Sequence, residues 1–178
     1  MAYCRPSEML KVKGSQVIGP TVGSPYRHWA VVLHPRAEET PSKILAFGEV
    51  IAFDLPKYKV VEVALRVVAQ QTSPNHRLFN VDLSWASRKF VTAAQRCGVE
   101  CLNPQLYQLR HSGPSVDIEL KIHTLQEVKL RGRWRSDNSM ARYTKPSRLN
   151  EQLQRLPPAV RREALLAPGR LSAHLKQR

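Results

Sequence analysis

Cysteine is scarce in this chain, and its three cysteines are too few to build a disulfide framework. Cys97 and Cys101 also lack the paired spacing of a zinc site. Long apolar runs are missing as well, because the stretches 29–33 and 60–69 are too short or too interrupted to span a bilayer. The N-terminus shows no pattern of a secretory leader. These absences predict an intracellular protein in a reducing compartment, with no membrane segment and no structural metal.

Acidic residues are also few, with 14 Asp and Glu against 28 Lys and Arg, so that the formal net charge is +14 at pH 7. A charge of this size attracts polyanions, and nucleic acid is the first partner to consider. An anionic membrane surface and ribosomal RNA are the alternatives that charge alone leaves open. No phosphate-loop pattern GxxxxGK[ST] occurs, which argues against an ATP-driven enzyme and predicts no nucleotide partner.

The first third of the sequence predicts a short helix followed by a small sheet. Residues 6–10 begin like a helical turn with proline early, and several glycines then indicate a loop. Residues 28–33 and 50–53 are rich in Val, Ile and aromatic side chains, with a polar connection between them, as in a β-hairpin. Lys43 falls near the second strand of this predicted hairpin.

The remaining sequence is predicted to be mostly helical. Apolar spacing favours helices over 60–68 and 84–97, the second ended by Gly98, and Asn103-Pro104 is typical of a helix start. Thr124 and Glu127 form a capping box for a helix to Gly132, and Ser136 is a cap for a helix that ends near Tyr143. We therefore predict an α+β fold, with one main domain over 1–147, which the family resemblance described below implies to be catalytic, and a helical tail over 148–178.

One set of residues stands in a characteristic order: Arg5 with Glu8, Lys43, the segment 109–113, Gly132-Arg133-Trp134, and Tyr143 nine residues after Trp134. This order resembles the tyrosine recombinase, or phage-integrase, family over roughly residues 2–150. That family has an Arg followed by an acid, a β-hairpin Lys, a His-x-x-Arg helix, a His or Trp, and a Tyr nucleophile. The run 131–143 is most similar to the eukaryotic mobile-element branch.

The resemblance implies roles for five residues in DNA breaking and rejoining. Arg5 and Arg110 would grip the scissile phosphate, since guanidinium groups pair with its oxygens through two hydrogen bonds. Trp134 would add an indole N–H donor, Lys43 would protonate the departing 5′ oxygen, and Tyr143 would form a 3′-phosphotyrosine link. The implied partner is double-stranded DNA, bound by a homo-oligomer, a tetramer, in the nucleus if the source is eukaryotic. No cofactor or metal is implied.

The sequence departs from the family pattern at Tyr107, which stands where the family has the His of His-x-x-Arg. A tyrosine can donate a hydrogen bond to phosphate, but with a pKa of about 10 it is a poor proton acceptor. His111, one residue after Arg110, is a supporting candidate that could compensate for the missing histidine. It lies about 100° around the helix from Arg110, however, so we favour a packing or capping role. Lys57 and Lys59 are alternatives to Lys43. Glu8 is expected to orient Arg5 or to cap its helix.

The family places further helices and a DNA-clamping domain ahead of the first Arg, so the resemblance implies an N-terminally truncated domain. Three functions remain open: a DNA strand transferase, a catalytically degenerate DNA-binding remnant, and a basic protein of an RNA–protein particle. The third predicts that the five residues do not cluster. The tail is expected either to dock on a neighbouring protomer or to fold back on its own chain.

Overall fold

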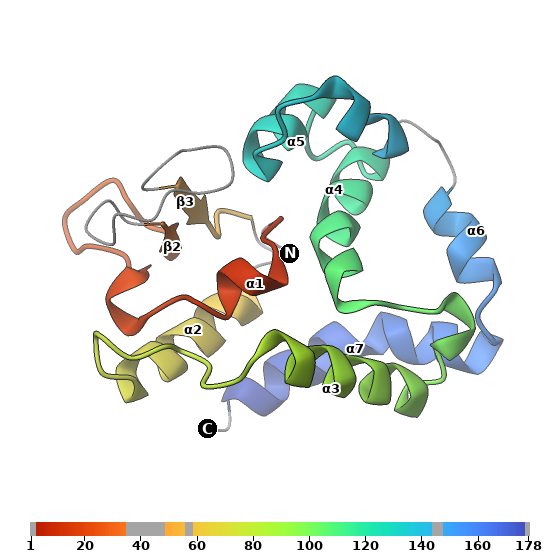
Figure 1. Ribbon diagram of the computed structural model, residues 1–178, viewed down its shortest axis with the longest axis horizontal. Coiled ribbons are helices and arrows are strands. Elements are labelled where there is room, and N and C mark those ends of the chain that lie inside the picture. The colour runs from red at the N-terminus through yellow and green to blue at the C-terminus, as the bar shows by residue number, and fades with distance from the viewer. Residues whose placement is uncertain (1–2, 35–48, 56–58, 144–147, 177–178) are drawn as a thin grey trace. The chain divides into compact units, whose positions relative to one another are not determined.

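The computed structural model describes residues 3–34, 49–55, 59–143 and 148–176 (Figure 1). It is mostly helical with one small three-stranded antiparallel sheet, so the predicted α+β class is confirmed. The chain forms two compact units, one of residues 1–6 with 82–170 and the other of residues 7–81 with 171–178. Within the described ranges, no helix is long and apolar enough to cross a bilayer.

The unit of residues 7–81 is built around the sheet. Its strands are β1 (Val17–Ile18), β2 (Ala30–Leu33) and β3 (Glu49–Ala52), and β2 pairs antiparallel with both neighbours. The predicted hairpin is confirmed in β2 and β3, where Val31, Leu33 and Ile51 turn their side chains into the core. Strand β1 was expected to be loop; its two β-branched residues pair with the edge of β2 instead.

Two helices belong to the same region of the chain. Helix α1 (Pro6–Met9) is the predicted helical turn, and α2 (Lys59–Gln71) contains the predicted apolar segment 60–68. Between them along the sequence, a short 3₁₀ helix (Gly14–Gln16) leads into β1.

The unit of residues 82–170 begins with α3 (Leu83–Arg96). Asp82 caps this helix by accepting a hydrogen bond of 2.6 Å from the backbone N–H of Trp85. Gly98 follows with a φ of 67°, as expected for the residue that ends a helix. The next expectation is wrong: Asn103 has a φ of 45° and closes a 3₁₀ turn (Glu100–Leu102), because asparagine tolerates this left-handed conformation.

Helix α4 (Leu109–Glu119) therefore begins later than predicted, after a second 3₁₀ turn (Leu106–Gln108). Helix α5 (Leu125–Gly132) starts at the predicted capping box, in which the N–H of Thr124 donates to Glu127 over 2.6 Å and the N–H of Glu127 donates to Thr124 over 3.2 Å. Beyond it, two 3₁₀ turns (Asp137–Ser139 and Ala141–Tyr143) replace the single helix that we expected after Ser136.

The tail is helical, with α6 (Arg148–Gln154) and α7 (Pro158–Lys176). Arg155, in the turn between them, donates a hydrogen bond of 2.7 Å to the carbonyl of Cys101. Leu156 beside it is buried. The turn between the tail helices is thus packed against its own chain at the segment that follows α3.

Candidate active site

Arg110 lies on α4 and is almost completely buried, with 1% of its surface exposed. Its Nη2 donates a hydrogen bond of 2.6 Å to the carbonyl of Gly132, at the end of α5. Its guanidinium carbon lies 4.9 Å from the ring centroid of Trp134, within the range of a cation–π contact. Arg110 therefore connects α4 to the Gly-Arg-Trp segment.

The backbone at Arg133 explains why this segment contains glycine. Arg133 ends α5 in a left-handed conformation, with φ 57° and ψ 40°, and so turns the chain back on itself. As a result, the ring of Trp134 folds over Gly132, where an added Cβ would lie 1.7 Å from a ring carbon. Only glycine leaves space for the indole ring in this position.

Tyr143 lies in the same cluster of side chains. It is buried with Tyr3, Val128 and Met140, and its ring centroid is 5.5 Å from that of Trp134. Its hydroxyl lies 2.5 Å from Nδ1 of His111. Burial raises the pKa of Tyr143 to about 12, although the positive charges of Arg142 and Arg110 act in the opposite direction.

The contact between His111 and Arg142 determines which group donates the hydrogen bond between Nδ1 of His111 and the hydroxyl of Tyr143. Nη1 of Arg142 lies 3.0 Å from Nε2 of His111, and arginine can only donate, so Nε2 accepts. A histidine that accepts at Nε2 carries its proton on Nδ1. His111 therefore donates to the oxygen of Tyr143, which favours negative charge on that oxygen and prevents Nδ1 from accepting the phenol proton.

In this geometry His111 contacts the hydroxyl of Tyr143, which is more than the packing or capping role that we favoured. The residue does point to a different side of α4 from Arg110, as its position in the helix requires. The end of α5 and the segment after it nevertheless contact both sides of α4. Gly132 and Trp134 contact Arg110 on one side, and Tyr143 contacts His111 on the other. His111 also stacks on Trp134, with ring centroids 6.2 Å apart and an interplanar angle of 17°.

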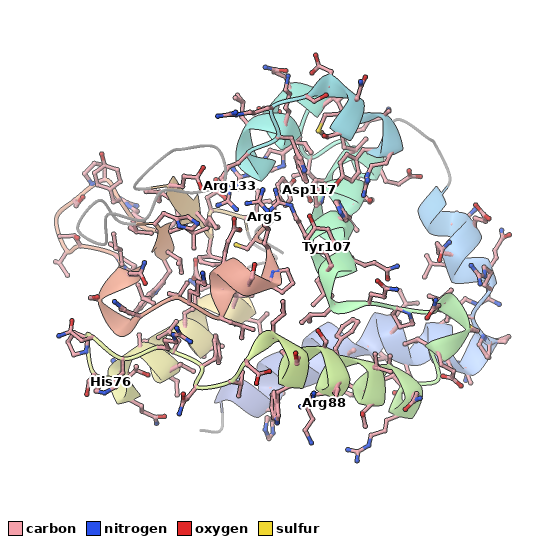
Figure 2. All side chains as sticks on the ribbon, in the orientation of Figure 1. Arg5, His76, Arg88, Tyr107, Asp117 and Arg133 are labelled. Carbon is pink, nitrogen blue, oxygen red and sulfur yellow. The ribbon has the colours of Figure 1, made fainter. Side chains whose placement is uncertain are left out.

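Tyr107, which stands in the position of the family's histidine, lies at the outer edge of this cluster. Tyr107 is labelled in Figure 2. Half of its surface, 51%, is exposed, and its ring meets that of His111 edge-on with the centroids 5.3 Å apart. The phenol of Tyr107 is therefore accessible to solvent, in contrast to that of Tyr143.

Sequence reasoning missed a buried carboxylate that anchors the segment carrying Arg5. Asp117 on α4 is fully buried and accepts a hydrogen bond from the hydroxyl of Tyr3. Nδ1 of His123 lies 3.5 Å from the same carboxylate. Arg5 lies two residues after Tyr3 in the sequence. The positions of Arg5 and Asp117 can be found in Figure 2. The fixed position of Tyr3 therefore limits where Arg5 can reach.

Two of the proposed site residues are not part of this cluster as the structure describes it. Glu8 belongs to the unit of residues 7–81, where it is buried in the wall of a pocket. Lys43 and its alternative Lys57 lie outside the described residues, whereas Lys59, the other alternative, is the first residue of α2. The structure thus brings together Arg110, His111, Trp134, Tyr143 and Tyr107, and anchors the segment of Arg5 beside them through Tyr3.

In comparisons with known proteins, no family model, no curated protein and no solved structure matches this chain.

Proposed function

We propose that this protein is a DNA strand transferase of the tyrosine recombinase type, with Tyr143 as its nucleophile. The observation that carries the proposal is the meeting of Arg110, Trp134 and Tyr143, which come from three different segments of the chain. The guanidinium of Arg110 packs on Trp134, and the ring of Trp134 lies beside that of Tyr143. The positive charge of Arg110 also acts on the phenol of Tyr143. A phosphate that Arg110 grips once the segment 132–134 has moved would therefore lie near the phenol oxygen.

The proposed reaction exchanges one ester bond for another. The oxygen of Tyr143 attacks phosphorus, the bond from phosphorus to the 5′ oxygen breaks, and the 5′ oxygen takes a proton, for which Lys43 is the proposed donor. A 5′ hydroxyl from another strand then attacks the 3′-phosphotyrosine and releases the tyrosine. Since each step replaces one phosphoester bond by another, the exchange needs no external source of energy. Duplex DNA and a homotetramer assembled on it are the proposed partners.

His111 and Arg110 have complementary parts in this proposal. His111 donates a hydrogen bond to the oxygen of Tyr143 and so stabilises the phenolate that attacks, while Arg110 stabilises charge on the phosphate oxygens. The phenol proton must leave for a group other than His111, because Nδ1 of His111 already carries a proton. A non-bridging phosphate oxygen or a water molecule is the proposed acceptor.

A covalent trapping experiment tests this function. The protein is incubated with a library of nicked duplexes, in which cleavage next to the nick releases a short fragment and prevents rejoining. We expect a protein–DNA adduct that survives denaturing electrophoresis in the unmodified protein and is lost in Tyr143→Phe, while both proteins bind the DNA equally. Equal adduct yield from the two proteins would reject Tyr143 as the nucleophile.

A second candidate function, DNA binding without cleavage, is favoured by the burial of Arg110. With 1% of its surface exposed and Nη2 bonded to Gly132, this side chain reaches a phosphate only if the segment 132–134 moves. The elevated pKa of Tyr143 also opposes formation of the phenolate at neutral pH. This candidate predicts DNA binding that weakens steeply with salt and no adduct from the unmodified protein.

A further inference from the structure

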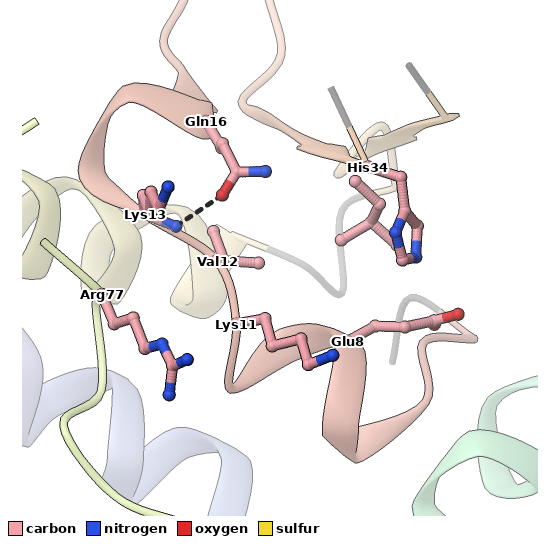
Figure 3. Close-up of a pocket in the computed structure, with 8 residues that line it drawn as sticks. Glu8, Lys11, Val12, Lys13, Gln16, His34 and Arg77 are labelled. Carbon is pink, nitrogen blue, oxygen red and sulfur yellow. Dashed lines mark hydrogen bonds between the residues drawn. The ribbon is translucent and has the colours of Figure 1, made fainter. Parts of the chain in front are cut away.

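The unit of residues 7–81 contains a pocket of about 240 Å³ whose lining is rich in cationic side chains (Figure 3). The residues that line it are Glu8, Lys11, Val12, Lys13, Gln16, Leu33, His34 and Arg77. Among the described residues assigned to the reaction above, only the supporting Glu8 contributes to this pocket.

Backbone pairing brings two of its cations together. Lys13 and Arg77 are partners in an antiparallel β-bridge. The backbone hydrogen bonds of this bridge are made by the residues on either side of the pair. The N–H of Leu78 donates to the carbonyl of Val12 over 2.8 Å, and the N–H of Gly14 donates to the carbonyl of His76 over 3.0 Å. Lys13 and Arg77 are therefore a non-hydrogen-bonded pair, the arrangement in which opposed side chains start closest, with Cα atoms about 4.5 Å apart. Their side chains leave the backbone on the same face.

The backbone beneath these cations is fixed by buried groups. The side-chain amide of Gln16 accepts a hydrogen bond of 2.7 Å from the N–H of Lys13 (Figure 3). The same amide donates one of 3.0 Å to the carbonyl of Val32. Val12 and Leu33 in the lining are buried in the core. The positions from which the cations project are thus set before any ligand arrives, which lowers the entropy cost of binding.

The charge of the lining favours an anion. Lys11, Lys13 and Arg77 are cationic, whereas Glu8 is the one carboxylate among the described residues of the lining and lies buried in its wall. Three cationic side chains against one carboxylate attract an anion. His34 adds a ring that can donate a further hydrogen bond.

The size of the pocket limits what the anion can be. Pockets that enclose whole small molecules usually have volumes of about 300 Å³ or more. A pocket of about 240 Å³ is smaller, and it suits a single phosphate group rather than a whole nucleotide. We infer that this pocket binds a phosphate of the duplex DNA backbone, outside the scissile position. The choice of DNA as the source of the phosphate rests on the proposed function; the affinity for phosphate itself does not.

The test compares two double variants in the full chain. Lys13→Gln with Arg77→Gln removes two cations of the pocket, and Arg27→Gln with Arg66→Gln removes two exposed cations of the same unit that do not line it. Duplex affinity is measured by fluorescence anisotropy over a range of salt concentrations. Each phosphate that the protein neutralises contributes about 1 to the slope of log affinity against log salt, so we expect the loss of the single pocket phosphate to lower the slope by about 1 in the pocket variant, and the control to keep the slope of the unmodified protein.

Inorganic phosphate separates the two possible sources of the ligand. Phosphorus resonance line broadening should show phosphate binding to the unmodified protein and to the control, and its loss in the pocket variant. If inorganic phosphate binds the unmodified protein, but the pocket variant keeps the unmodified slope of duplex affinity against salt, the site takes free phosphate. This result would overturn the proposal that the site binds a phosphate of DNA. Absence of both effects would overturn the site altogether.

Two further points keep the test decisive. If the double variant fails to fold, Lys11→Gln alone, at an exposed position of the lining, should lower the slope by up to about 1, and an unchanged slope would count against the inference. Neither binding measurement depends on the covalent adduct at Tyr143. A protein without adduct can therefore still show the phosphate site, and a protein with adduct can lack it.

Discussion

Nδ1 of His111 lies 2.5 Å from the hydroxyl oxygen of Tyr143, and the guanidinium of Arg142 lies against the opposite nitrogen of the same ring. Because arginine can only donate, the proton of the imidazole is directed to the tyrosine oxygen. This arrangement gives the protein a hydrogen-bond donor to its proposed nucleophile, although the proposed resemblance puts Tyr107, and not His111, in the place of the histidine of the tyrosine recombinases. The donor comes from the position next to Arg110.

Substitution of His111 tests this donor role. His111→Ala removes a hydrogen bond to a group that becomes charged during attack, a contact with a typical value of about 1.5–3 kcal/mol, so we expect adduct formation to slow by roughly 10- to 100-fold. His111→Gln retains an N–H donor but is no base, and it should recover much of the rate. The measurement is the single-turnover rate of adduct formation. A rate for His111→Gln as low as for His111→Ala would contradict the donor role.

Gly132→Ala tests the packing of Trp134. The new Cβ would lie 1.7 Å from a ring carbon, so the indole must move away from Arg110. We expect a loss of about 1–3 kcal/mol in the free energy of unfolding, measured with urea, and weaker adduct formation. Gly169→Ala in α7 is the matched control, since nothing lies within 4 Å of its added Cβ, and it should stabilise the protein by up to about 1 kcal/mol. Equal effects of both variants would be evidence against this packing.

The ionisation of Tyr143 gives a prediction on pH. Burial raises its pKa from 10.0 to about 12, so folding favours the neutral phenol. The corresponding contribution to stability is fully present below pH 10.0 and is lost as the pH rises through about 12. Near-ultraviolet absorbance titration of the unmodified protein minus Tyr143→Phe should show one tyrosine with a midpoint near 12. A midpoint near 10.0 would mean that the phenol is solvated.

Asp117→Ala should loosen the segment that carries Arg5. It leaves the buried hydroxyl of Tyr3 without its acceptor, at an expected cost of about 1–3 kcal/mol in the free energy of unfolding. Amide hydrogen exchange at Cys4 and Arg5 should become faster than in the unmodified protein. The control is Asp137→Ala, whose carboxylate is 86% exposed and pairs with Lys129, so its removal should cost less than about 1 kcal/mol. Unchanged exchange in Asp117→Ala would refute the anchoring.

The local features that follow from short sequence patterns could be predicted. The capping box of Thr124 and Glu127 depends on residues three apart, and the antiparallel pairing of β2 with β3 depends on two β-rich segments and the connection between them. Family resemblance also indicated Arg110, Trp134 and Tyr143 as a group, and the structure places them in contact. These predictions needed only local spacing or the order of motifs.

Features that depend on tertiary contacts could not be predicted. Nothing near Asp117 in the sequence indicates that Tyr3, more than a hundred residues earlier, donates to it. The roles of His111 and Arg142 depend on how the chain after α5 passes over α4. Asn103 shows a different limit, because Asn-Pro is compatible both with a helix start and with the left-handed end of the preceding turn.

The identity of the residue that becomes joined to DNA is the most direct test of the central claim. The covalent adduct from the nicked duplexes is digested with protease and nuclease, and the modified peptide is sequenced by mass spectrometry. The account predicts a nucleotide on Tyr143, the buried tyrosine beside Arg110, Trp134 and His111. A nucleotide on the exposed Tyr107, or on any residue other than Tyr143, would contradict it.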